Sequence, residues 1–199
     1  EKAREILEDC AKNFSDNAAL RQEIGYSYLS QGKYDLALNE ANKAFSLAPM
    51  DPQNILLSGE IYLLKGDLIE AEKNYQKLVE SGKTNYVIFG KRDLSALYLL
   101  EGKFGKSKEQ IQQGLEQSSQ ADEPEWESSF HDCLGNLLLK AGDSAAALKE
   151  FDKAWNRAVE ADSLEWQRIA LWKKGLAYLG MNSIQKAQKT ADELKEFIE

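Results

Sequence analysis

Apolar residues recur along this chain at helical spacing, in paired segments that a glycine turn separates. Residues 34–47 are apolar on two sides, as a helix stacked between two neighbours requires. Residues 2–13 and 183–198 each carry a single apolar stripe, formed in the second case by Ile184, Ala187, Ala191, Leu194 and Ile198. The pattern predicts tandem helical hairpins that lie between two terminal helices with one apolar side each.

A residue skeleton occupies the same place in five of these paired segments. Its first copy contains Gly25, Tyr28, Gly32, Tyr34 and Ala37, and successive copies start 34, 36, 40 and 40 residues apart. A self-similar period of this length indicates a repeat architecture. The later copies read Gly59, Tyr62, Gly66, Leu68 and Ala71; Ser95, Tyr98, Gly102, Phe104 and Ser107; Gly135, Leu138, Gly142, Ser144 and Ala147; and Gly175, Tyr178, Asn182, Ile184 and Ala187.

Each position of the skeleton has a physical reason. We expect the first small residue of every copy, from Gly25 to Gly175, to lie where the two helices of a hairpin approach most closely. The turn glycine, Gly32 in the first copy, can adopt positive φ at a helix end, and Asn182 is the next-best residue for that conformation. The skeleton therefore predicts helix, left-handed turn, helix in each copy.

The first copy resembles the tetratricopeptide repeat family, because Gly25, Tyr28, Ala37, Ala41, Ala44 and Pro49 follow that family's helix-turn-helix signature. The resemblance implies an all-α, right-handed superhelical solenoid of about five and a half helix-turn-helix repeats. We place the five repeats at about residues 17–50, 51–83, 84–121, 122–161 and 162–199, as one continuous domain. Residues 1–16 then hold the second helix of an incomplete repeat or a capping helix, and the first alternative places further protein upstream.

The two 40-residue units share a second signature, an Ala-Asp pair followed by Glu-Trp at residues 125–126 and 165–166. Six additional residues lengthen the helices by about 9 Å. We expect Asp122 and Asp162 to cap the N-termini of the following helices, and Pro124 to occupy a first helical turn.

Catalytic and metal chemistry finds little support in the sequence. His131 is the only histidine, which removes histidine-pair metal sites, and we expect a structural role for it. The stretch from Gly102 to Ser107 imitates the end of a phosphate-binding loop, but Leu100 stands where the motif requires glycine. We therefore expect no enzyme activity, no cofactor and no metal.

The net charge and the cysteine content restrict the class of partner and the cellular compartment expected for this protein. The net charge of -8 and a pI of about 4.9 argue against nucleic acid, which requires clustered lysine and arginine. No apolar run approaches the roughly 18 residues of a membrane span. Cys10 and Cys133 have no CxxC spacing, and we interpret both as buried thiols of a reduced, cytoplasmic protein.

The resemblance also implies a binding surface, because in this family the first helix of each hairpin lines an inner groove. Few positions on that surface are charged, which favours a partner with apolar anchors and a basic residue facing Glu60 and Asp132. The positions do not carry the lysine, asparagine and arginine set that clamps chaperone C-termini. The predicted peptide-binding residues are Gln22, Tyr26, Leu56, Glu60, Phe89, Arg92, Asp132, Asn136 and Trp172.

The leading hypothesis for function is a non-enzymatic scaffold that binds a peptide or helix of a partner protein in this groove. A first alternative is a regulatory or sensor segment of a larger signalling protein. A second is self-assembly into a homo-oligomer through the apolar stripes of the terminal helices.

Overall fold

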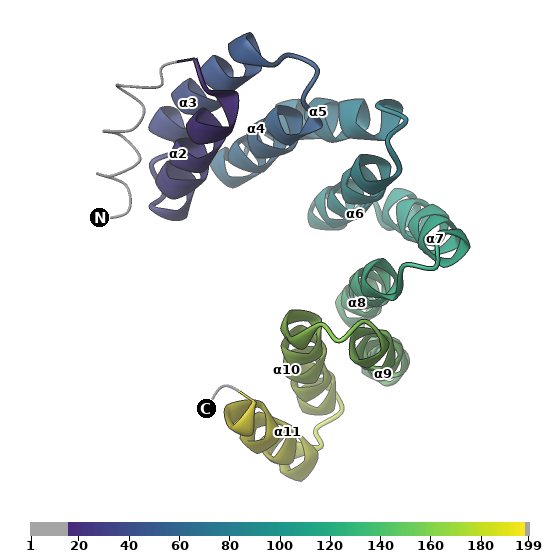
Figure 1. Ribbon diagram of the computed structural model, residues 1–199. Helices are drawn as coiled ribbons and strands as arrows, with labels where there is room; N and C mark the ends of the chain where they lie inside the picture. The colour runs from purple at the N-terminus through teal and green to yellow at the C-terminus, as the bar shows by residue number, and fades with distance from the viewer. Residues whose placement is uncertain (1–15, 198–199) are drawn as a thin grey trace. The chain divides into compact units, whose positions relative to one another are not determined.

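The computed structural model describes residues 16–197, and within that range every regular element is an α-helix. Ten helices there form five hairpins, as Figure 1 shows. The all-α hairpin architecture expected from the sequence is confirmed. The helices are α2 (Ala18–Ser30), α3 (Tyr34–Leu47), α4 (Pro52–Lys65), α5 (Leu68–Glu80), α6 (Thr84–Leu100), α7 (Phe104–Gln120), α8 (Pro124–Lys140), α9 (Ser144–Glu160), α10 (Leu164–Gly180) and α11 (Ile184–Glu196).

The five hairpins fall inside the five residue ranges assigned from the skeleton. Contacts group the chain into two compact units, one up to Gly90 and one from Lys91 onward, so that α6 begins in the first and ends in the second. The helix predicted at residues 2–13 and Cys10 lie outside the described residues.

A residue in the left-handed conformation separates the two helices of each hairpin. Gly32, Gly66, Gly102 and Gly142 have φ values between 71° and 84°, and Asn182 has φ 55°. These values confirm the predicted role of all five positions. Glycine reaches this conformation without a Cβ penalty, and asparagine tolerates it better than most residues.

The predicted caps at Asp122 and Asp162 are wrong. Both residues have positive φ, 54° and 52°, and each follows the end of a helix, α7 and α9 respectively, as its left-handed terminating residue. Glu123 and Ser163 occupy the N-cap positions of α8 and α10 instead. Aspartate serves as a C-terminal residue here because its short polar side chain also tolerates the left-handed region.

Two expectations for the longer units are confirmed. Pro124 is the first residue of α8, where its missing N–H costs no hydrogen bond. Helices α6 to α10 have 17 residues each, against 13 or 14 in α2 to α5. The additional residues of the 40-residue units thus lengthen helices.

In the first unit, α4 packs against α2 and α3 through an apolar and a polar contact. Leu57 and Ile61 of α4 are fully buried against Ala37 and Ala41 of α3. Asn54, also fully buried, donates through Nδ2 to the carbonyls of Ala44 and Ala48 at 3.1 and 2.7 Å. Its Oδ1 accepts a hydrogen bond of 2.6 Å from Gln22 Nε2. Asn54 therefore adds a second hydrogen bond to each of two carbonyls at the C-terminal end of α3 and joins three helices.

Aromatic side chains fill the space over two of the skeleton glycines. A Cβ at Gly59 would lie 2.6 Å from the Tyr75 ring, and one at Gly135 would overlap the Phe151 ring. Both glycines thus allow the close helix approach that we predicted. At Gly25 the nearest atom, 2.9 Å away, comes from Leu57 of the following hairpin.

The prediction for Gly175 is wrong. A Cβ there would find only Thr190 Cγ2, at an ordinary contact distance of 3.9 Å. The reason lies 16 residues further on, where Ala191 occupies the position that Tyr75 and Phe151 hold in the other hairpins. The last hairpin therefore keeps an open space between its two helices.

Candidate functional site

Helix α10 exposes a row of large apolar side chains in the second unit. Trp172, Leu176 and Leu179 are 51%, 36% and 52% exposed, and their spacing of four and three residues places them on one side of the helix. Three such side chains face water on one side of the helix. The chain therefore lacks the hydrophobic stabilisation that their burial would give. Scattered exposed leucines are ordinary, whereas a contiguous apolar row is a candidate interaction surface.

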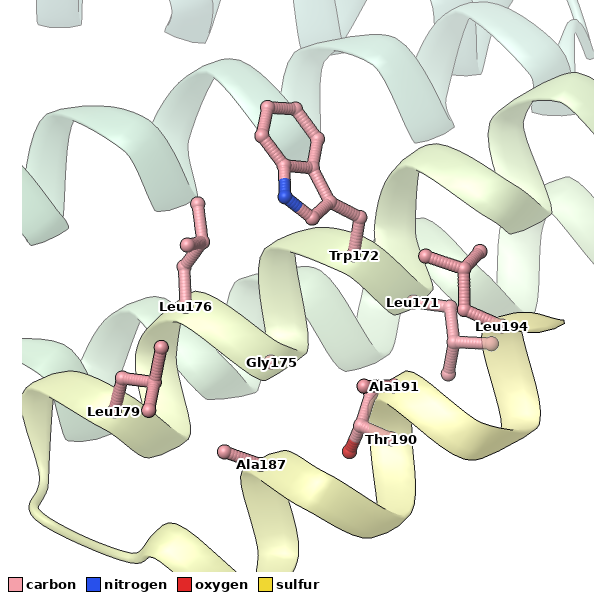
Figure 2. Close-up of a pocket in the computed structure, with 9 residues that line it drawn as sticks. All are labelled: Leu171, Trp172, Gly175, Leu176, Leu179, Ala187, Thr190, Ala191 and Leu194. Atoms are coloured by element: carbon pink, nitrogen blue, oxygen red, sulfur yellow. The ribbon is translucent and has the colours of Figure 1, made fainter.

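An apolar pocket of about 180 Å³ lies between this helix and α11 (Figure 2). None of its lining residues is charged, and Thr190 satisfies its hydroxyl by donating to Lys186 O at 2.8 Å. Apart from the Trp172 indole N–H, the lining presents mainly hydrocarbon, so the pocket favours an apolar ligand over a charged one. The lining residues are Leu171, Trp172, Gly175, Leu176, Leu179, Ala187, Thr190, Ala191 and Leu194, and we call this set the α10–α11 groove.

A polar chain borders the exposed row on one side. Lys173 Nζ lies 4.6 Å from the centroid of the Trp172 ring and donates to Asn136 Oδ1 at 2.9 Å. Asn136 Nδ2 in turn donates to Asp132 Oδ2 at 2.8 Å. Burial raises the pKa of the Asp132 carboxyl, while the positive charge of Lys173 acts in the opposite direction. Three predicted site residues, Asp132, Asn136 and Trp172, are thus brought together through Lys173.

The remaining predicted residue of the second unit, Arg92, donates from Nε to Asp93 Oδ1 at 2.8 Å. In the first unit, Gln22 and Leu56 are buried, and Gln22 bonds to both Asp51 and Asn54. These two side chains hold the hairpins together and offer little surface to a partner. The others are half-buried: Tyr26 packs against the α2–α4 core, Glu60 lies on α4, and the Phe89 ring lies 6.2 Å from that of Tyr86.

Sequence reasoning missed the groove residues on α11 and the space at Gly175. A signal was present: the position 16 residues after the first small residue of the skeleton holds Ala41, Tyr75, Ile111, Phe151 and Ala191 in the five copies. Alanine occurs only in the first and last copies. In the first copy Leu57 fills the resulting space, but this contact can be recognised only once α4 is placed.

His131, the single histidine, links α8 to α9. Its Nδ1 lies 2.8 Å from Glu150 Oε2, and Glu150 also accepts from Lys153 Nζ at 2.8 Å. Burial lowers the pKa of His131, with the Glu150 carboxylate acting against that effect. The contact joins the two helices of one hairpin, as a structural role requires.

Cys133 is half-buried and has a free thiol, and the loss of solvation around its sulfur favours the protonated form. Desolvation raises its pKa to about 12, with the nearby Asp132 charge as a further cause. Because the thiolate is the reactive species, we expect iodoacetamide at pH 8 to alkylate the native C10S variant at least ~1000-fold more slowly than the urea-unfolded variant. Mass spectrometry of quenched samples measures both rates. Comparable rates in the two states would contradict the raised pKa of the Cys133 thiol.

Residues 16–197 hold neither a metal-binding cluster nor a membrane-spanning helix. No group of three histidine, cysteine or carboxylate side chains there is arranged to hold a metal ion. None of the helices in that range combines the length and the apolar character needed to cross a bilayer.

Residues 18–50 match the family model of the tetratricopeptide repeat. BBSome complex member BBS4 of Bos taurus is 27% identical over 169 residues, which cover 85% of this chain and 31% of that protein. This chain thus spans less than a third of the length of that relative. Among solved structures, TTC0263, a tetratricopeptide repeat protein of Thermus thermophilus, has a TM-score of 0.70 at 19% identity, with 90% of this chain and 91% of that chain covered.

A second similar structure is the APC/C hetero-tetramer Cut9-Hcn1, with a TM-score of 0.76 at 15% identity over 95% of this chain and 36% of the matched chain. At these identities the structural likeness concerns the fold. Together with the hairpin register, it shows that the described residues have the helical-hairpin fold of such repeat proteins, and residues 18–50 match the tetratricopeptide repeat itself.

Proposed function

We propose that this chain is a non-enzymatic protein-interaction scaffold that binds an apolar segment of a partner protein on α10. The observation that carries the proposal is the exposed row of Trp172, Leu176 and Leu179 beside an uncharged pocket. Interfaces derive most of their affinity from a few aromatic and aliphatic anchors that enter such pockets. The proposal therefore makes Trp172 the central residue of the predicted binding set.

Two further observations support this function. BBS4 is named as a member of a complex, and Cut9-Hcn1 is a hetero-tetramer, so relatives of this fold assemble with other proteins. Within this chain, Lys173 already provides a positive charge near Asp132. The proposed segment consequently needs apolar anchors but no basic residue at this point.

Peptides selected from a random 12-residue phage library against the intact chain test the proposal. We expect the double substitution Trp172→Ala and Leu176→Ala to weaken their binding by about 2 kcal/mol or more, roughly 30-fold in Kd. Isothermal titration calorimetry measures the change, and circular dichroism verifies that helical content is retained.

Exposed apolar residues of the first unit provide the matched control. Leu36 and Ile69 are 48% and 70% exposed, and replacing both by alanine is expected to leave peptide affinity within about twofold of the parent. Peptides that bind the Trp172 and Leu176 variant as tightly as the parent would exclude α10 as the binding surface.

A further inference from the structure

The hairpin tips of the second unit lie along one edge of that unit. Its successive helices run antiparallel: Gly114 of α7 packs against Phe130 of α8, six residues before the end of one helix and six after the start of the next. At the tips, Gly180 at the end of α10 lies against Ser144 at the start of α9. The turns α6–α7, α8–α9 and α10–α11 therefore share one edge, and the loops α7–α8 and α9–α10 share the opposite edge.

These two edges carry opposite charge. We define the turn edge by residues 100–108, 140–148 and 180–188, and the loop edge by residues 115–128 and 155–168. The turn edge contains five lysines and two carboxylates, whereas the loop edge contains eight carboxylates and two arginines. Both carboxylates of the turn edge have partners, since Glu101 pairs with Lys103 at 2.8 Å and Asp143 accepts from Ala146 N at 2.9 Å. All five lysines are exposed: Lys103, Lys106, Lys108, Lys140 and Lys186.

The distance between the edges keeps their charges separate. Helices α7 to α10 have 17 residues each, which holds the two edges about 25 Å apart. At physiological ionic strength charges are screened over about 8 Å. The acidic loop edge therefore weakens the positive potential at the turn edge little, although the chain has a net charge of -8. An anionic surface that approaches the turn edge meets mainly its lysines.

The third hairpin adds large apolar side chains to this basic edge. Leu100 and Phe104 stand on either side of the α6–α7 turn and are 69% and 44% exposed. Gly102, with φ 72°, reverses the chain between them, and a Cβ at Gly105 would meet no atom within 4 Å. Helices α8 and α9 follow in the array and leave both side chains exposed, so hairpin stacking does not cover them. The tip thus presents an apolar wedge that is bordered by lysines.

The fifth hairpin repeats this arrangement after a shift of 80 residues. In the third hairpin Lys106 Nζ lies 5.1 Å from the centroid of the Tyr98 ring, and in the fifth Lys186 Nζ lies 5.7 Å from that of Tyr178. Ile184, the counterpart of Phe104, is 59% exposed. Attraction between ammonium and ring holds each lysine beside the exposed apolar side chain. Two tips of the turn edge therefore combine a positive charge with an apolar residue.

We propose that the turn edge of the second unit binds the surface of a bilayer that contains acidic phospholipids. Leu100 and Phe104 enter the headgroup region, and the five lysines face the lipid phosphates. Peripheral binding of this kind combines the burial of apolar side chains with the attraction of basic residues to anionic lipids. These seven side chains lie outside the α10–α11 groove, so this surface is separate from the one proposed for a partner protein.

Two features favour a bilayer over an acidic protein segment as the occupant. The lysines are distributed over three successive hairpin tips, which suits an extended anionic surface better than one peptide. Leu100 and Phe104 protrude instead of lining a pocket, and a bilayer receives protruding side chains without a matching cavity. The charge and the shape of the turn edge thus fit the same occupant.

Co-sedimentation of the intact chain with lipid vesicles tests this proposal. Vesicles of phosphatidylcholine with about 30% phosphatidylserine provide the anionic surface, and vesicles of phosphatidylcholine alone provide the neutral one. At about 0.1 M NaCl we expect at least roughly tenfold tighter binding to the anionic vesicles. At about 0.5 M NaCl we expect that preference to disappear, because salt screens the lysines.

Apolar substitutions at the two edges locate the contact. We expect Leu100→Ser with Phe104→Ser to weaken binding to the anionic vesicles about tenfold or more. Val159→Ser with Leu164→Ser removes two comparably exposed side chains, 51% and 61%, from the loop edge, and this variant is expected to bind like the parent. Circular dichroism verifies that helical content is retained. Should the first variant fail to fold, Leu100→Ser alone is expected to weaken binding about threefold or more.

Lysine substitutions separate charge from fold. A lysine close to an anionic membrane contributes about fivefold to affinity, so replacing Lys103, Lys106 and Lys108 by glutamine is expected to weaken binding about 100-fold. The same three positions with arginine keep the charge and are expected to bind within about twofold of the parent.

Several results would overturn the proposal. One is a failure of the intact chain to sediment with the anionic vesicles, and another is equal loss of binding in the turn-edge and loop-edge serine variants. A labelled peptide of alternating glutamate and phenylalanine tests the other occupant. If that peptide binds through Leu100 and Phe104 while the vesicles do not, the turn edge belongs to an acidic protein segment and the bilayer proposal falls.

Discussion

Replacing Asn54 by leucine is expected to destabilise the first unit by about 2–4 kcal/mol. Asn54 is fully buried, and its amide satisfies the carbonyls of Ala44 and Ala48 while its oxygen accepts from Gln22. Leucine has nearly the same size but makes none of these three hydrogen bonds. Ala44 O and Ala48 O keep their bonds from Ala48 N and Asp51 N, and Gln22 keeps its bond to Asp51, so the expected loss is that of the three bonds themselves. Urea unfolding followed by circular dichroism at 222 nm measures the loss as a lower transition midpoint.

Asn42 on the same hairpin provides the control for this substitution. It is exposed on α3, and Asn42→Leu is expected to change the free energy of unfolding by no more than about 0.5 kcal/mol. If Asn54→Leu were as well tolerated as Asn42→Leu, the buried amide would contribute no net stability to the contact between α3 and α4.

Alanine at two equivalent glycines is expected to act in opposite directions. Gly135→Ala destabilises the second unit by about 1–3 kcal/mol, because the new Cβ overlaps the buried Phe151 ring. Gly175→Ala stabilises the same unit by about 1 kcal/mol, because the space at Gly175 is open and alanine has the better helix propensity. Thermal and urea unfolding of the two variants beside the parent measure both changes.

Gly135 and Gly175 hold the same position in their repeats. They differ in the residue 16 positions later, which is Phe151 for Gly135 and Ala191 for Gly175, so the two substitutions can be compared directly. Changes of the same sign at both glycines would contradict the open space between α10 and α11. A double variant with Gly135→Ala and Phe151→Ala should recover part of the steric cost while adding that of a cavity. The coupling free energy between the two substitutions measures the direct contact between residues 135 and 151.

The last hairpin differs from the other four in how its interior is filled. Its glycine and alanine leave a space that no other residue of the second unit fills among those described, and its exposed row of Trp172, Leu176 and Leu179 borders that space. An apolar groove of this kind stabilises the isolated chain less than a filled core does, because part of its lining stays in contact with water.

Hairpin boundaries were predictable because local backbone chemistry decides them. A glycine or Asn182 with positive φ ends the first helix of each hairpin, and no tertiary contact is needed to explain that preference. The caps at Asp122 and Asp162 were misassigned because aspartate is favourable both at an N-cap and in the left-handed region. A shift of one residue in the turn decides between these roles, and the sequence contains both possibilities.

Binding residues were less predictable than the fold. Gln22 and Trp172 occupy the same position in the first and last repeats, yet Gln22 is buried in hydrogen bonds to α4 while Trp172 is 51% exposed. Leu56, predicted from the same pattern, is buried. A repeat position predicts which side of a helix a residue occupies, but its exposure depends on what covers that side.

The tandem hairpins, their register and the left-handed turns can be deduced from the amino-acid sequence, because the repeat period, the glycines and the small residues act through local conformation and helix approach. Which spaces are filled depends on tertiary packing. Leu57 closes the groove over Gly25 from the next hairpin, whereas the equivalent groove over Gly175 remains open. The physical reason is that burial is a property of the neighbouring helix as much as of the residue itself, and that neighbour differs from repeat to repeat.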